Sequence, residues 1–152
     1  MEKPLKLISS KSTKSLLTYA GSIPFLLGAF LLIADIGTQK SISNIQHLLS
    51  VYGLVIGSFM AGTLWGQQLD ENSGWQRYVL LCSNTIALAL WAAFVIFSFT
   101  SLMVAYAISF LALLLVDYQL SENGMSNVAY FKLRFRVTII VVLAIGISAL
   151  AG

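Results

Sequence analysis

Charged side chains at the ends of apolar stretches are the groups of this sequence that are placed to do chemistry. Asp117 closes one apolar stretch, and Arg134 and Arg136 open the next one. An ionised side chain among apolar ones is costly unless it is paired, by about 3 kcal/mol at the centre of a bilayer and by less near its edge. We therefore expect an ion pair between Asp117 and either Arg134 or Arg136.

Further polar side chains fall at the ends of neighbouring apolar segments, and they predict a polar pocket at one membrane face. The pocket would comprise Trp65, Gln67, Asn84, Asp117, Arg134, Arg136 and Thr138. An arginine and an interfacial tryptophan suit an anionic head group, and an amide beside a carboxylate suits a polar ring such as a quinone head. The alternative is that the ion pair only joins two helices, since polar cross-links in membrane bundles are often structural.

The remaining reactive residue types are too sparse for catalysis or metal binding. His47 is the single histidine and Cys82 the single cysteine, so a histidine-rich metal cage and an intramolecular disulfide are excluded. No nucleophile–base set, glycine-rich phosphate loop or pair of haem-ligating histidines is recognisable. We therefore predict no enzymatic activity, no cofactor and no metal.

The elements that position these residues follow from composition. Of the 152 residues, 58% are hydrophobic and 10% are charged, whereas about a quarter of the residues of a soluble domain are charged. The apolar segments are apolar on all sides, and a membrane span needs roughly 20 such residues. The sequence predicts an all-α integral membrane bundle of five transmembrane helices, at about 16–36, 48–69, 78–97, 102–118 and 133–150, after a basic tail at 1–15.

Lysine and arginine residues set the expected orientation. With the amino terminus in the cytoplasm, Lys40 is the single lysine or arginine left outside, as the positive-inside rule requires. The carboxyl terminus is then periplasmic. We expect the protein to lie in the inner membrane of a bacterium, with the mitochondrial inner membrane as the alternative. The formal net charge of +3 reflects membrane topology and contact with anionic lipid rather than nucleic-acid binding.

Small residues follow one face of the second span. They recur every four residues in two neighbouring ladders, which are Gly53, Gly57 and Ala61, and Ser58, Gly62 and Gly66. Because lipid gives helices little reason to hide apolar side chains, close backbone packing must hold them together. We predict that this is the central helix, packed by two neighbours, and that Gly62→Leu displaces them; a homodimer seam or a ligand groove remains the alternative.

Several spaced motifs resemble those of a known family. They are Tyr19-x-Gly21-x-x-Pro24, Tyr52-Gly53, Ser58-Phe59-x-x-Gly62-x-x-Trp65-Gly66, Asp117, and Tyr130-x-x-Leu133-Arg134 followed by Thr138. Over nearly its whole length the chain resembles the transmembrane protein 69 family, a domain of unknown function of bacterial inner membranes and mitochondria. It departs from the family where Asn127-Val128-Ala129 replaces a proline and a tryptophan. The resemblance implies a small multi-span membrane protein and brings no established activity.

The expected function is therefore that of a non-catalytic membrane protein. Small size, a smooth helix face, a midplane without charge and a polar cluster at the inner face suit an accessory or assembly partner, or a binder of a lipid or quinone head group. A transporter ordinarily needs more spans, inverted repeats or midplane charges. The alternative is an oligomeric channel or small-solute transporter. The expected partners are the bilayer and another membrane protein or further copies of this chain, and not nucleic acid.

Overall fold

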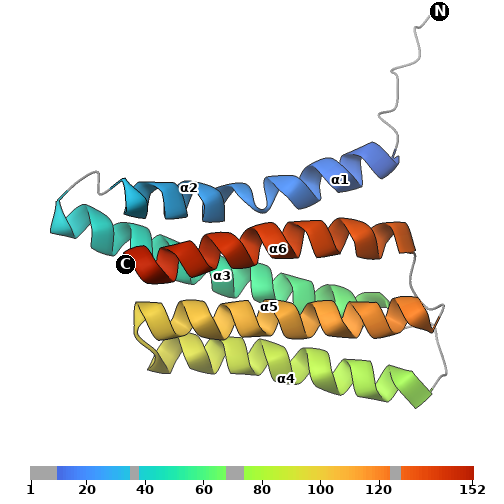
Figure 1. Ribbon diagram of the computed structural model, residues 1–152. Coiled ribbons are helices and arrows are strands. Elements are labelled where there is room, and N and C mark those ends of the chain that lie inside the picture. The colour runs from blue at the N-terminus through green and yellow to red at the C-terminus, as the bar shows by residue number, and fades with distance from the viewer. Residues whose placement is uncertain (1–9, 35–37, 68–73, 124–127) are drawn as a thin grey trace, which may run out of the picture.

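Helices make up nearly all of the chain that the computed structural model describes, which is residues 10–34, 38–67, 74–123 and 128–152. The helices of these ranges, shown in Figure 1, are α1 (Ser10–Ala20), α2 (Ile23–Ile33), α3 (Gln39–Gln67), α4 (Gly74–Ile96), α5 (Phe99–Glu122) and α6 (Val128–Ala151). No strand occurs within those ranges. Most of the predicted basic tail, residues 1–9, lies outside them.

Five helical segments are long and apolar enough to cross a membrane. They are Ser15–Ile33, which joins α1 to α2, and Gln39–Gly66, Gln76–Ile96, Phe99–Glu122 and Val128–Ala151. The all-α fold and the five spans agree with the prediction. The helices extend beyond the predicted spans because polar residues continue them past the apolar stretch, as at Gln39–His47 at the start of α3.

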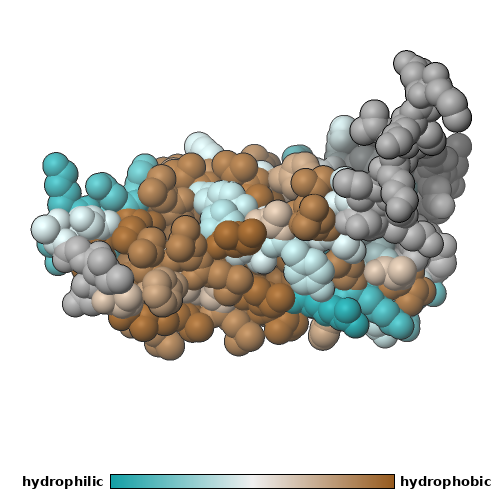
Figure 2. All heavy atoms as spheres, turned by 90° about the horizontal axis from the view of Figure 1, so that it is seen from above, coloured by the Kyte–Doolittle hydropathy of each residue, from teal (hydrophilic) through white to brown (hydrophobic). Residues whose placement is uncertain are grey.

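The outer surface has the character of a membrane protein. Each of the six described helices exposes large apolar side chains, such as Phe30 on α2, Leu88 on α4 and Leu143 on α6. Figure 2 shows hydrophobic residues over the middle of the molecule and hydrophilic residues toward both ends. Exposed apolar patches of this extent mark a surface that something apolar covers, and here lipid covers it. The chain is a multi-pass membrane protein.

The first span is interrupted between α1 and α2, which the sequence prediction treated as one helix. Pro24 stands in the first turn of α2, and its missing N–H breaks the hydrogen-bond ladder of a continuous helix. The hydroxyl of Ser22 donates to the Tyr19 carbonyl at 2.7 Å, and Tyr52 of α3 donates to the Gly21 carbonyl at 2.9 Å. The break is thus tied to α3, and α1 can take a different path from α2.

The six described helices form a bundle in which α3, α5 and α6 lie between α2 and α4 (Figure 1), and each of these three helices contacts three others. α3 contacts α2, α4 and α5, while α5 contacts α3, α4 and α6. α4 and α5 form the tight antiparallel pair that the short 98–101 gap predicts, with only Phe97 and Ser98 outside a helix. Phe110 of α5 meets Phe25 of α2 edge-on, with ring centroids 6.1 Å apart.

The first ladder of small residues on α3 packs closely against other helices. Gly53 lies beneath the ring of Tyr106, and a Cβ added at Gly57 would come within 2.7 Å of Leu90 on α4. Ala61 is 1% exposed. Tyr106 also donates from its hydroxyl to the Ser50 carbonyl at 2.8 Å. The first ladder therefore lies on a side of α3 that faces other helices.

Gly62 and Gly66 of the second ladder do not pack against any other described residue, and this corrects the prediction for those two positions. Gly62 and Gly66 are exposed, and a Cβ added at either would meet nothing within 4 Å. Ser58 is half-buried. The two ladders are offset by one residue, which is about 100° around a helix, so both cannot face the same neighbours. Gly62→Leu is therefore not expected to displace a helix of the bundle.

Candidate functional site

A buried ion pair joins α5 to α6. The Nε of Arg134 lies 3.0 Å from Oδ2 of Asp117, and the two side chains are 5% and 1% exposed. Of the two arginines predicted to pair with Asp117, Arg134 does so. Arg136 is exposed, because two residues turn a helix by about 200°.

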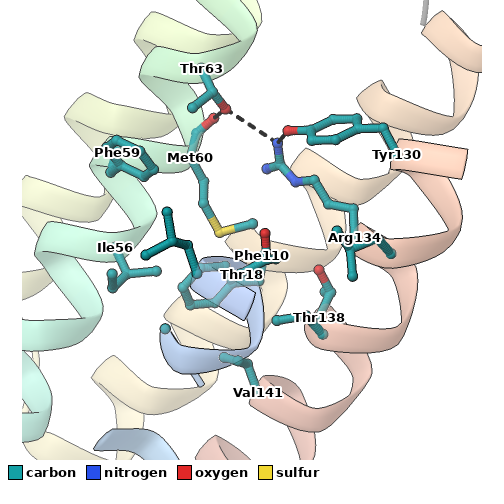
Figure 3. A pocket seen from close by; sticks show the side chains of 14 residues that line it. Thr18, Ile56, Phe59, Met60, Thr63, Phe110, Tyr130, Arg134, Thr138 and Val141 are labelled. Carbon is teal, nitrogen blue, oxygen red and sulfur yellow. Dashed lines mark hydrogen bonds between the residues drawn. The ribbon is translucent and has the colours of Figure 1, made fainter. Parts of the chain in front are cut away.

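The guanidinium of Arg134 also connects α6 to α3. Its Nη1 donates to the Tyr130 hydroxyl at 3.0 Å and to the Thr63 hydroxyl at 3.2 Å (Figure 3). Thr63 in turn donates to the Met60 carbonyl at 2.7 Å. Tyr130 stands one turn before Arg134 on the same helix, so these two residues are neighbours by spacing alone. Thr63 reaches the same group from a different helix.

Part of this polar cluster has no hydrogen-bond partner among the described residues. The buried atoms concerned are Nη2 of Arg134 and both carboxylate oxygens of Asp117, although Oδ2 is in ionic contact with Arg134. Buried polar groups in proteins are nearly always hydrogen-bonded, and each exception calls for an explanation. The carboxylate keeps its ionic partner, so the N–H donors of Nη2 are the conspicuous exception.

A cavity of about 360 Å³ lies beside the guanidinium. α3 and α6 supply most of its lining, and α5 contributes Phe110. The end of α1 contributes Leu17 and Thr18, and the turn after α1 contributes Gly21. Figure 3 shows Arg134 reaching into this space from α6 toward Met60 and Thr63 on α3. Small-molecule sites typically measure about 300–1,000 Å³, so the cavity has room for a small ligand.

The cavity is polar at one end and apolar elsewhere. Arg134, Tyr130 and Thr63 gather at the polar end. The apolar lining includes Ile56, Phe59, Met60, Phe110, Val137 and Val141. Two of the lining residues, Leu17 and Phe59, are each 67% exposed on the outer surface. The cavity therefore borders the lipid-facing side of the bundle.

The predicted polar pocket is not a single pocket in the structure. Arg134 and Thr138 line the cavity, and Asp117 lies behind Arg134. Trp65 and Asn84 line another hollow, which they share with Arg77 between α3 and α4.

Arg136 lines a third hollow, with Tyr118, Phe131 and Phe135 between α5 and α6. The side chain of Gln67 lies outside the described part of the structure. Helix rotation distributes the described residues of the predicted pocket over different flanks of the bundle.

Several lining residues were not predicted. Tyr130 could have been found from its spacing of four residues before Arg134. Thr63, Met60 and Phe110 carry no sequence signal of their own, because only the packing of α3 and α5 beside α6 brings them to the cavity. Apolar lining residues of this kind are indistinguishable in sequence from those that face lipid.

Comparison with known proteins places the chain in a family. A family model described as a protein of unknown function, DUF3429, matches residues 10–150. Neither the curated proteins nor the solved structures include a match to this chain. The narrower resemblance to transmembrane protein 69 stays a prediction. The match spans the five membrane segments and the Arg134 cavity, and the chain belongs to the DUF3429 family.

Proposed function

We propose that this chain is a non-catalytic membrane protein that binds the head of a lipid-soluble molecule in the Arg134 cavity. The observation that carries the proposal is a buried guanidinium beside a largely apolar cavity, whose Nη2 has no hydrogen-bond partner in the described part of the chain. A buried donor without an acceptor costs roughly 1–3 kcal/mol, and more when the group is charged. A ligand with an acceptor at this point would remove that cost.

The rest of the cavity suits the apolar part of such a ligand. Phe59, Met60 and Phe110 provide apolar contact area, and the exposed Leu17 and Phe59 leave a path toward lipid. Inside a site with a low dielectric constant, a hydrogen bond to a charged group is stronger than in water. One end of the ligand is then bound through hydrogen bonds and the other through apolar burial. An accessory protein that holds a lipid-phase molecule needs no more than this.

We propose the orientation and location from charge placement. With the amino terminus in the cytoplasm, the start of α6 and the Arg134 end of the cavity lie toward the cytoplasmic leaflet. The bacterial inner membrane is the proposed location. A ligand taken up from the lipid would then enter with its head toward the cytoplasmic surface.

Native mass spectrometry of the protein purified in mild detergent tests the proposal. We expect the wild-type chain to carry a lipid-phase small molecule, and Arg134→Met to lose it. Arg136→Met is the matched control, because it removes an exposed arginine only two residues away. Ile56→Trp narrows the cavity and leaves the Asp117–Arg134 ion pair intact. This variant should also fail to retain the ligand, although it removes no charged residue.

The proposal is wrong if the wild-type chain is purified without any such molecule and binds none when lipid extract is added. It is equally wrong if Arg134→Met and Ile56→Trp retain the same molecule as the wild type.

A further inference from the structure

We infer that the ligand of the Arg134 cavity is an uncharged, carbonyl-bearing ring of the quinone class, not an anionic lipid or a fatty acid. This inference rests on the proposed function and specifies its ligand. It draws on the charge of the site, the hydrogen-bonding groups that face the cavity, and the shape and lining of the apolar part.

The charge of the site is already balanced. Arg134 is the one charged residue among the described residues that line the cavity, and its guanidinium is paired with Asp117 at 3.0 Å. An anionic ligand would add a second negative charge near the buried Asp117 carboxylate, in a largely apolar surrounding. Like charges disfavour each other strongly under those conditions. A neutral acceptor can bind Nη2 without changing the net charge.

The charged group at the polar end of the cavity offers only donors, and the hydroxyl groups that line the cavity beside it can donate as well as accept. A guanidinium has N–H donors and no acceptor, and Nη2 has no partner among the described residues. The Tyr130 hydroxyl already accepts a hydrogen bond from Nη1, so its own hydrogen remains to be donated. Thr138 places a further hydroxyl one turn along α6, on the wall of the same cavity. The head of the ligand must therefore accept hydrogen bonds, as a carbonyl oxygen does.

The lining favours a flat ring with one apolar tail. Phe59, Phe110 and Tyr130 bring three aromatic side chains to the cavity, and Met60 extends between α3 and Arg134 (Figure 3). Aromatic rings and the methionine sulfur both pack well against another ring. A volume of about 360 Å³ is at the small end for a ligand site, which suits a ring and the start of a tail better than a lipid with two acyl chains.

Competitive binding with two defined probes tests the inference. Decylubiquinone supplies a neutral ring with two carbonyl groups and one tail, and oleate supplies a carboxylate with one longer tail. The amount of each probe that the purified protein retains in detergent is compared with the amount that protein-free detergent retains. We expect decylubiquinone to be retained and oleate not to displace it. Arg134→Met should weaken quinone binding at least tenfold, and Arg136→Met should bind as the wild type does.

The outcomes separate the inference from the proposed function. If oleate binds at least as tightly as the quinone and depends on Arg134, the site is anionic-lipid-specific: the inference is wrong and the proposed function stands. If neither probe nor any lipid-phase molecule depends on Arg134 or Ile56, both are wrong. Ile56→Trp retains the Asp117–Arg134 pair, so a loss of quinone binding in that variant supports the cavity even if Arg134→Met folds poorly.

Discussion

Asp117 and Arg134 illustrate what single residues contribute to this molecule. Both are almost fully buried, and the carboxylate has the guanidinium as its only ionic partner among the described residues. Removal of one member of a buried ion pair leaves the other charge uncompensated and lowers the folding stability by about 3–5 kcal/mol. Replacement of both members by apolar residues is often neutral. The stability of the pair is thus a property of the two residues together.

A double-mutant cycle measures that coupling. We expect Asp117→Leu alone and Arg134→Met alone each to lower the thermal-unfolding midpoint in detergent, by an amount consistent with about 3–5 kcal/mol. The double variant should recover most of the loss because no unpaired charge remains. Arg136→Met is the control and should unfold as the wild type does. Losses that simply add in the double variant would contradict the description of Asp117 and Arg134 as a coupled pair.

The ion pair also shows how far sequence reasoning reaches at the scale of a residue. An acid that closes one apolar segment and a base that opens the next must come close, so the pair was predictable. The choice of Arg134 over Arg136 needed the rotation of α6, which a uniformly apolar helix does not reveal. Thr63 and Phe110 come from helices distant in sequence, and nothing in the sequence places either beside Arg134.

At the scale of the helix, small residues on α3 have opposite roles according to the side that they occupy. Gly57 lies against Leu90 of α4, whereas Gly62, little more than one turn later, faces open space. The recurrence of small residues predicts close packing, and Gly53 and Gly57 do lie against other helices while Ala61 is buried. It failed for Gly62 and Gly66 because spacing does not say which of two ladders faces the bundle.

Substitution by leucine separates the two sides of α3. We expect Gly57→Leu to lower the unfolding midpoint in detergent, since overpacking costs typically about 1–3 kcal/mol and a Cβ here would already come within 2.7 Å of Leu90. Gly62→Leu is the matched control and should be neutral or slightly stabilising, because leucine favours a helix over glycine. Equal destabilisation by both variants would show that Gly62 also packs against a neighbour.

The break between α1 and α2 was visible in the sequence only as Pro24. Proline is well tolerated in the first turn of a helix, so the residue alone did not distinguish a kink from a new helix start. The hydrogen bond from Tyr52 to the Gly21 carbonyl depends on α3 lying beside this point. Since Leu17 and Thr18 line the cavity, the break contributes directly to the proposed site.

At the scale of the whole molecule, the number of spans was predictable and their lateral order was not. Five apolar runs, each long enough to cross a bilayer as a helix, predict five spans. The helices are apolar on every side, so hydrophobic periodicity does not show which face of a helix packs against which neighbour. The neighbours of α3, α5 and α6, and the position of α1 beside the cavity, come only from the structure.

The proposed orientation makes a prediction for the two chain ends. A cysteine-reactive, membrane-impermeant label should modify a cysteine added after Gly152 in intact spheroplasts. A cysteine added near Met1 should react only after the membrane is opened. The background is a Cys82→Ser chain, so that the native thiol does not interfere. Labelling of both ends in intact spheroplasts would contradict an odd number of spans and the neighbour relations that depend on it.

The most direct test of the whole account is an experimental structure of the chain in lipid nanodiscs with added decylubiquinone. We expect density for a flat ring between α3 and α6, with an oxygen within hydrogen-bond distance of Arg134 Nη2 and a tail that leaves past Leu17 and Phe59. A structure in which the space is closed by side chains, with the guanidinium of Arg134 satisfied entirely by the protein, would contradict it.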